Sequence, residues 1–185
     1  MSNRLTKIYT RTGDDGTTGL GDGSRTNKSS LRIEVIGSID EVNSIVSIIR
    51  AQDMPEDINL LLMNVQHILF DLGGELSLPG QSLVRGTTVD YLEQEIDRLN
   101  QQLPPLKEFI LPGGNESASI CHFARSTCRR AERHLVKLAE SEKINEYTLK
   151  FLNRLSDLLF VIARTIVKAY GDDEIYWDKN RINNL

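Results

Sequence analysis

Apolar side chains recur at helical spacing through most of the chain after about residue 30. The first series steps by four and three residues, which places its members on one helix face: Val35, Ile39, Val42, Val46 and Ile49. Four more series share this spacing, within residues 61–72, 89–103, 121–138 and 152–166. Because the links between them are short and contain Gly or Pro, the pattern predicts an all-α, antiparallel five-helix bundle.

Local chemistry predicts where several helices begin and end. Thr88 can cap the third helix, and Pro104 ends it because proline lacks the backbone N–H. The fourth helix is expected to begin near Asn115, and Gly171 is placed to stop the fifth. Cys and Ala line the apolar stripe of the fourth helix, so we expect it to pack closely against its neighbours at the centre of the bundle.

The first 30 residues differ from the rest of the chain. They are rich in Gly, Thr, Asp and Ser and have only scattered apolar positions, so they predict an irregular segment without a regular helix. The sequence is therefore interpreted as one domain over residues 1–185. It would comprise the irregular segment 1–30, the helical bundle 31–171 and a C-terminal tail 172–185.

Composition and charge exclude several classes of protein. The 39% apolar and 26% charged residues are typical of a globular protein. A net charge of −4 gives no overall attraction to nucleic acid or anionic membranes, so neither is expected as a partner. The chain has no apolar run of membrane-spanning length and no apolar signal core near its start, which predicts a cytoplasmic protein. Cys121 and Cys128 are expected to be reduced and buried.

The segment Thr10–Leu20 could bind phosphate. Its glycines can bring backbone N–H groups onto an anion, and its threonines add hydroxyl donors. Asp14, Asp15 and Asp22 could hold Mg²⁺ directly or through water. The alternative is a flexible polar arm. Generic motifs do not decide between the two: no Walker A sequence is present, and Ser24 replaces the third glycine of the dinucleotide-binding fingerprint.

Three arginines lie on one face of the predicted fourth helix. Arg125, Arg129 and Arg133 recur every four residues. Like charges at this spacing repel, so an anionic ligand opposite them would favour the arrangement. Each charge-assisted hydrogen bond from an Arg fork to phosphate contributes about 1.5–3 kcal/mol. The alternative is a solvated basic face, partly neutralised by Glu132.

The fifth and first helices carry further polar positions. A second face of the predicted fifth helix, separate from its leucines, indicates an oligomer interface, a binding site or both: Asn153, Asp157, Phe160 and Arg164. In the first helix, Asp40 either caps a turn or pairs with an arginine elsewhere.

The three histidines (His67, His122 and His134) lie in no HExxH or Glu-x-x-His motif, and no Ser-His-Asp or Cys-His signature is present. We therefore predict no metal site built by the protein alone and expect these histidines to be structural or at the surface. Anion-binding groups without a protein nucleophile fit chemistry in which the bound substrates react with each other.

Five motifs, in order along nearly the whole chain, resemble the PduO-type ATP:cob(I)alamin adenosyltransferases. They are Tyr-Thr-Arg-Thr-Gly-Asp-Asp-Gly at 9–16, Gly-Ser-Ile-Asp-Glu at 37–41, Phe-Ile-Leu-Pro-Gly-Gly at 109–114, Cys-Arg-Arg-Ala-Glu-Arg at 128–133 and Leu-Asn-Arg-Leu-Ser-Asp at 152–157. Each motif alone is weak, but the five together are highly specific.

The resemblance implies transfer of the 5′-deoxyadenosyl group of ATP to the cobalt of cob(I)alamin, giving adenosylcobalamin and triphosphate. ATP with Mg²⁺ and the corrinoid would be the ligands, and the protein would position them and stabilise charge. The family also implies a homotrimer of five-helix bundles with active sites between subunits. A reductase and an adenosylcobalamin-dependent enzyme are possible further partners.

The resemblance also implies roles for particular residues. ATP phosphates would be bound by the N-terminal loop through Thr10, Arg11, Thr12, Gly13, Thr18 and Lys28. The remaining ATP-binding set would be Arg129, Arg130, Glu132, Arg133 and Asn153. Asp40 and Arg125 match a salt bridge that crosses the subunit interface beside the corrinoid. Phe109 matches the aromatic residue that blocks the lower face of cobalt and favours four-coordinate Co(II), and Phe160 matches a further wall of that pocket. The catalytic set would be Arg129, Asp40, Arg125 and Phe109.

Three other functions stay open at this point. A non-catalytic carrier would deliver adenosylcobalamin to a dependent enzyme, although the intact ATP-binding set argues against loss of catalysis. A nucleotide-sensing regulator would bind ATP without any response to corrinoid. A purely structural trimer would leave the three-arginine face unexplained.

Overall fold

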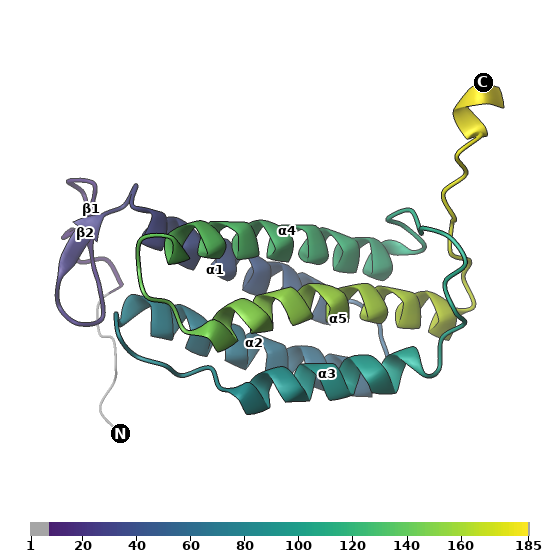
Figure 1. The fold of residues 1–185 in the computed structure, drawn as a ribbon, viewed down its shortest axis with the longest axis horizontal. Coiled ribbons are helices and arrows are strands. Elements are labelled where there is room, and N and C mark those ends of the chain that lie inside the picture. Colours follow the sequence, from purple (N-terminus) through teal and green to yellow (C-terminus); the bar gives the residue numbers. More distant parts are fainter. Residues whose placement is uncertain (1–7, 185) are drawn as a thin grey trace.

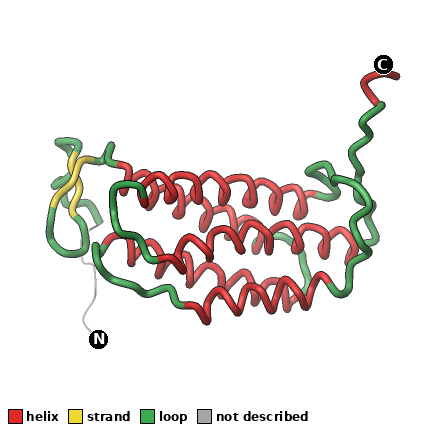
Figure 2. Tube along the Cα trace, in the orientation of Figure 1, coloured by secondary structure: helices red, strands yellow, loops and turns green. Residues whose placement is uncertain are grey.

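The computed structural model describes residues 8–184. The prediction of no signal core rests partly on residues 1–7, which lie outside this range. The described chain contains five α-helices: α1 (Leu31–Arg50), α2 (Glu56–Ser77), α3 (Gly86–Asn100), α4 (Glu116–Ala139) and α5 (Glu146–Tyr170). They lie side by side in an antiparallel bundle (Figures 1 and 2), which confirms the predicted all-α fold. Among the described helices, none is long and apolar enough to cross a membrane.

Helix α4 packs against both α1 and α5. The small side chains Cys121, Ala124, Cys128 and Ala131 are fully buried, so the predicted close approach is confirmed. Both cysteines are free thiols. Burial raises the pKa of Cys121 to about 12, and the thiol of Cys128 donates to the carbonyl oxygen of Leu152 at 3.3 Å.

Two predicted helix boundaries are confirmed. The Asn115 side chain accepts a hydrogen bond from the backbone N–H of Ala118 at 2.9 Å and so caps the start of α4. At the other end of the bundle, Gly171 adopts a left-handed conformation with φ of 70° and ends α5.

The predicted boundaries of α3 are wrong at both ends. The helix begins at Gly86, with Arg85 in the N-cap position and no side-chain cap, so Thr88 lies inside its first turn. It ends at Asn100, before Leu103 is reached. The start is set by contacts from distant parts of the chain, because the preceding residues are fixed by the buried carboxylate of Glu75.

Glu75 holds the α2–α3 link against the start of α5. One carboxylate oxygen accepts hydrogen bonds from the backbone N–H groups of Leu83 at 2.6 Å and Val84 at 2.9 Å, and from the Asn145 side chain at 3.1 Å. The other oxygen accepts from the hydroxyl of Thr148. Because Glu75 is only 4% exposed, these four donors satisfy a carboxylate that water hardly reaches.

We expect Glu75→Gln to lower the free energy of unfolding by about 3 kcal/mol, because the amide would turn an N–H₂ group toward buried donors. Urea denaturation followed by circular dichroism measures the change. Asp71→Asn is the matched control on α2, since Asp71 is exposed. Equal stabilities of the two variants would show that the buried contacts of Glu75 contribute little.

The N-terminal segment was expected to be irregular, but part of it forms a hairpin. Strands β1 (Thr17–Gly19) and β2 (Arg25–Asn27) pair antiparallel, with Thr18 opposite Thr26. The turn between them is closed by Asp22, whose carboxylate accepts from the backbone N–H and the hydroxyl of Ser24. These short-range polar contacts stabilise a sheet that has no apolar face.

Gly21 attaches this hairpin to the bundle. Its backbone N–H donates to the carbonyl oxygen of Ser77 at the end of α2, at 2.7 Å. A Cβ atom on Gly21 would lie 2.7 Å from the side chain of Leu78, so any larger residue here would require Leu78 to move. The hairpin is therefore held at one end of the bundle (Figure 1).

Candidate functional site

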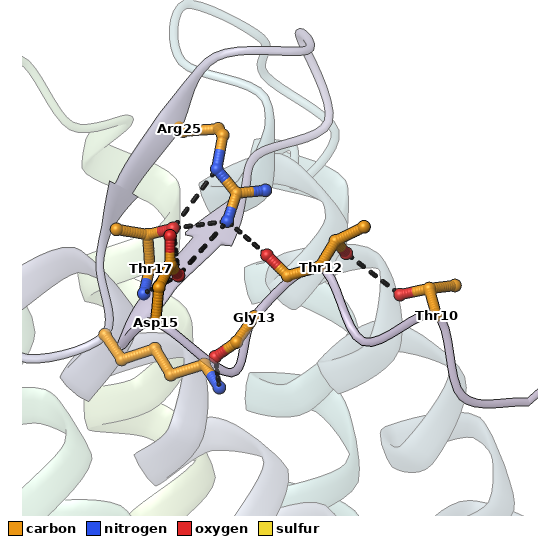
Figure 3. A network of polar contacts seen from close by, with 7 residues as sticks. Thr10, Thr12, Gly13, Asp15, Thr17 and Arg25 are labelled. Carbon is orange, nitrogen blue, oxygen red and sulfur yellow. Dashed lines mark hydrogen bonds and ion pairs between the residues drawn. The ribbon is translucent and has the colours of Figure 1, made fainter.

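The predicted phosphate-binding loop is an ordered network in the structure (Figure 3). The Asp15 carboxylate accepts hydrogen bonds from the backbone N–H of Thr17 at 2.9 Å and from its hydroxyl at 2.7 Å. These two bonds lower the pKa of Asp15. The guanidinium of Arg25 donates to Thr17 and to the carbonyl oxygen of Thr12. Arg25, for which the sequence indicated no role, joins β2 to this loop.

Four of the predicted ATP-binding residues lie close together in this loop. Lys28 donates from Nζ to the carbonyl oxygen of Gly13 at 2.7 Å, and the hydroxyls of Thr10 and Thr12 are 2.9 Å apart. Thr18 lies five positions after Gly13, within β1.

Arg11 has a φ of 61°, the left-handed conformation that non-glycine residues rarely adopt. Its side chain lies over the ring of Tyr9, with Cζ 5.4 Å from the ring centroid. A cation is therefore held at the surface of the loop next to exposed hydroxyls and glycine backbone, the chemistry that phosphate oxygens require.

The aspartates of the loop divide into two kinds. Asp15 and Asp22 each accept hydrogen bonds from the residue two positions later, so their carboxylates close turns. Asp14 is exposed and has no ion pair or side-chain hydrogen bond with any residue between 8 and 184. No group of three His, Cys, Asp or Glu within the described residues could hold a metal ion. A single carboxylate fits Mg²⁺ that arrives with ATP, because Mg²⁺ is usually bound by phosphates, water and one or two carboxylates.

The arginine row on α4 faces outward. Arg129 and Arg133 are exposed, and Arg133 donates to the carbonyl oxygen of Arg129 at 3.2 Å. Within residues 8–184 the guanidinium of Arg129 has no hydrogen-bond or ion-pair partner. Arg125 lies on the same row, eight residues or about 12 Å before Arg133.

Glu132 and Asn153, both predicted at the ATP site, meet in the structure. The amide of Asn153 on α5 donates to the carboxylate of Glu132 on α4 at 2.9 Å. The Asn153 oxygen accepts from Arg154 at 2.9 Å, and Arg154 pairs with Glu93 on α3. This chain of contacts fixes Asn153 beside the arginine row.

A groove of about 550 Å³ opens at the opposite end of the row. Phe109, which is 77% exposed, and Phe160 form part of its wall. His122 and Arg125 also line the groove. The rings of His122 and Phe160 pack edge to face, with their centroids 6.0 Å apart. Lys107 lines the groove as well.

Two polar atoms under this groove are buried without a hydrogen-bond partner among the described residues: Nδ1 of His122 and Nε of Arg125. Burial lowers the pKa of both side chains, and the charge of Arg125 lowers that of His122 further. His122 was expected to be structural or at the surface, yet it lies under a candidate site. Its position three residues before Arg125 was the signal, because i and i+3 share a helix face. The groove therefore suits a large ligand that is both apolar and polar.

Asp40 and Arg125 do not meet within one chain. Asp40 lies on α1 beside a hollow of about 310 Å³ that also includes Phe123, whose side chain is 58% exposed. Arg130, another predicted ATP ligand, lines the same hollow and pairs with Glu41. Arg125 instead lies at the groove with Phe109.

The candidate residues thus form separate groups along the bundle. The N-terminal loop lies at one end, and the loop that carries Phe109 lies at the other (Figure 1). Helix α5, with 25 residues, is about 37 Å long. No hydrogen bond or ion pair of the described residues joins the loop at Thr10–Lys28 to the arginine row.

The family model for cobalamin adenosyltransferase matches residues 8–166. The chain belongs to this family. A cobalamin adenosyltransferase from Cupriavidus metallidurans is 52% identical over 182 residues, which cover 98% of this chain and 99% of the relative. A corrinoid adenosyltransferase from Bacillus subtilis is 43% identical and covers 95% of this chain and 94% of its own length.

Solved structures of the cobalamin adenosyltransferase family share the fold. A phenylalanine-to-alanine variant of a PduO-type ATP:corrinoid adenosyltransferase from Lactobacillus reuteri, complexed with cobalamin and ATP, has a TM-score of 0.88 at 35% identity, covering 94% of this chain and 100% of that chain. An arginine-to-lysine variant complexed with ATP has a TM-score of 0.87 at 34% identity, covering 92% of this chain and 100% of that chain. Both similarities extend over nearly the whole bundle.

Proposed function

We propose that this chain is an ATP:corrinoid adenosyltransferase, which transfers the 5′-deoxyadenosyl group of ATP to the cobalt of cob(I)alamin and releases triphosphate. The observation that carries the proposal is the arginine row of α4, which leads from the apolar groove at Arg125 to the unpartnered guanidinium of Arg129. A binding region for a large amphiphilic ligand is thus continuous with a binding region for an anion. The relatives named as cobalamin and corrinoid adenosyltransferases support the same activity.

The reaction needs positioning and charge stabilisation more than a protein nucleophile. Cobalt(I) supplies the electron pair that forms the Co–C bond, and the C5′–O bond breaks as triphosphate leaves. Arg129 and Arg133 would stabilise the negative charge that grows on triphosphate, and the loop residues Thr12, Gly13 and Lys28 would hold it. Mg²⁺ would screen the same charge. These triphosphate-binding residues also favour an enzyme over a carrier, because a carrier would not need to bind triphosphate.

The groove would receive the corrinoid. Phe109 and Phe160 would contact the apolar ring, and Phe109 would exclude water and the nucleotide-loop base from the lower face of cobalt. Arg125 would reach polar substituents at the ring edge or pair with Asp40 of another subunit. This separation of apolar and polar contacts is usual for sites that orient a large cofactor.

We also propose that the active enzyme is a homotrimer with sites between subunits. The N-terminal loop and the loop that carries Phe109 lie at opposite ends of one bundle (Figure 1). Because ATP and cobalt must touch, the N-terminal loop of one chain and the groove of another would form one site. Asp40 and Arg125 lie on different faces, which suits a pair formed between chains. The exposed Phe123 beside Asp40 would be covered by the neighbouring subunit.

The wider setting is proposed on the same basis. The chain would act as one domain over residues 1–185 in the cytoplasm. A reductase would supply cob(I)alamin, and an adenosylcobalamin-dependent enzyme would receive the product.

The activity is tested with purified protein, MgATP and chemically reduced cob(I)alamin under anaerobic conditions. We expect adenosylcobalamin in the visible spectrum and an equal amount of triphosphate. Binding of both ligands without product would favour the carrier function. Binding of ATP without any response to corrinoid would favour a nucleotide-sensing regulator.

A further inference from the structure

The C-terminal segment Asp172–Trp177 runs antiparallel to the loop that carries Phe109 (Figure 1). The backbone N–H of Trp177 donates to the carbonyl oxygen of Phe109 at 2.7 Å, and that of Leu111 donates to the carbonyl oxygen of Ile175 at 2.8 Å. A third bond joins the side chains of Asn115 and Asp172 at 2.7 Å. We call residues 172–177 the strap, because they bind this loop along its length.

A buried ion pair anchors the strap on α5. Nε of Arg164 lies 2.7 Å from the carboxylate of Glu174, and the two side chains are only 2% and 13% exposed. The same guanidinium donates to the carbonyl oxygen of Pro104 at 2.9 Å, so it fixes the link from α3 as well. The hydroxyl of Tyr176 donates to Glu174 at 3.1 Å. Separating an ion pair that is this little exposed to water is strongly unfavourable, because it leaves a buried charge without a partner.

This anchor changes the interpretation of the second face of α5. The sequence suggested that the residues on this face are covered by another subunit or by a ligand. At Arg164 the cover is the chain's own C-terminal strap, through Glu174. The burial of this part of α5 is therefore explained within one chain.

Phe109 depends on the strap for its position. Its ring is 77% exposed, so packing against the core does not fix it. Its backbone is held at the carbonyl oxygen by Trp177. A few residues further on, Gly114 closes the loop against α5, where a Cβ atom would lie 2.5 Å from Val167. The groove wall therefore has an exposed side chain on a tightly held backbone.

We propose that Glu174 is a positioning residue for adenosylation: through the Arg164 ion pair and the strap, it holds Phe109 at the edge of the corrinoid groove. This role rests on the proposed function. Glu174 does not touch the substrate, and its effect reaches the cobalt through the backbone of residues 109–111. A small displacement there matters, since a shift of about 1 Å in a positioned group can lower the rate by about 100-fold.

The test compares Glu174→Gln with the matched control Asp173→Asn, in which the neighbouring exposed acid undergoes the same change. A second pair avoids disturbing the buried charge. Trp177→Pro removes the N–H that binds Phe109, whereas Trp177→Ala keeps this N–H and removes the side chain. Three experiments are made on the full chain: hydrogen exchange at the Leu111 amide, steady-state kinetics that give kcat and the KM for ATP, and electron paramagnetic resonance that gives the four-coordinate fraction of bound cob(II)alamin.

We expect Glu174→Gln and Trp177→Pro to speed exchange at Leu111 by about tenfold or more, because the strap opens locally. We expect kcat to fall by about tenfold with the KM for ATP within about twofold, since only the corrinoid side is displaced. The four-coordinate fraction should fall with kcat. Asp173→Asn and Trp177→Ala should resemble the wild type in all three measurements.

Unchanged exchange at Leu111 in Glu174→Gln and Trp177→Pro would overturn the anchoring role. Faster exchange with unchanged kcat and unchanged Co(II) coordination would overturn the positioning role while leaving the enzyme activity established. A wild-type protein that forms no adenosylcobalamin would overturn the proposed function and the positioning role together, and hydrogen exchange would then report only on the strap itself.

Discussion

Replacing Arg129 with lysine should lower kcat by about 10- to 100-fold, because lysine keeps the charge but cannot form the two-pronged contact of a guanidinium with phosphate. Arg129 is exposed, and its guanidinium has no hydrogen-bond or ion-pair partner among residues 8–184. It is therefore available to a ligand without breaking an internal contact. The loss should appear in kcat more than in the KM for ATP, since charge on triphosphate is greatest as it leaves.

Steady-state adenosylation with MgATP and cob(I)alamin measures both constants. Arg85→Lys is the matched control, because Arg85 is exposed before α3, away from the row. The free energy of unfolding of Arg129→Lys should stay within about 0.5 kcal/mol of the wild type, as is usual for an exposed side chain. Turnover near the wild-type value in Arg129→Lys would remove Arg129 from the leaving-group site.

Replacing Phe109 with alanine should lower kcat by about 100-fold while leaving the affinity for ATP within about twofold, because the groove that Phe109 borders includes neither Arg129 nor Arg133. Without the ring, water or the nucleotide-loop base would reach the lower face of cobalt. The Co(II) form would then gain a fifth ligand and be harder to reduce. The fold should be unaffected, since the ring is 77% exposed.

Turnover, ATP binding by calorimetry and the electron paramagnetic resonance spectrum of bound cob(II)alamin together check this expectation. Phe70→Ala is the matched control: Phe70 is 76% exposed, almost as much as Phe109, but it lies on α2. A large loss of ATP affinity in Phe109→Ala would mean that Phe109 contacts the nucleotide and has been assigned to the wrong ligand.

Helix positions could be predicted because their causes are local. Spacing of three and four residues decides which side chains share a face, whatever the rest of the chain does. The cap at Asn115 and the stop at Gly171 depend only on neighbouring residues and were predicted correctly. The start of α3 was predicted wrongly, because it depends on Glu75, whose hydrogen-bond partners lie up to 73 positions away in the sequence.

The residues of the candidate site also divide into those that the local sequence predicts and those that it does not. The arginine row follows from helical spacing, and the family motifs predicted roles for the loop, Phe109 and Asn153 without any coordinates. Helical spacing placed His122 on the same face as Arg125, but the sequence could not indicate that a groove lies over them or that Arg25 joins β2 to the loop. Polar segments such as residues 10–28 have no apolar alternation from which a strand could be predicted.

The sequence by itself determined five amphipathic helices, the order of the motifs and the family. Only the tertiary structure decided which motifs meet. It brought Glu132 to Asn153, placed Asp40 and Arg125 on different faces, and buried Arg164 under Glu174 of the strap. The physical reason is that periodicity and capping act within one or two helical turns. Contacts between distant residues depend instead on how whole helices pack, and that packing is a property of the complete chain.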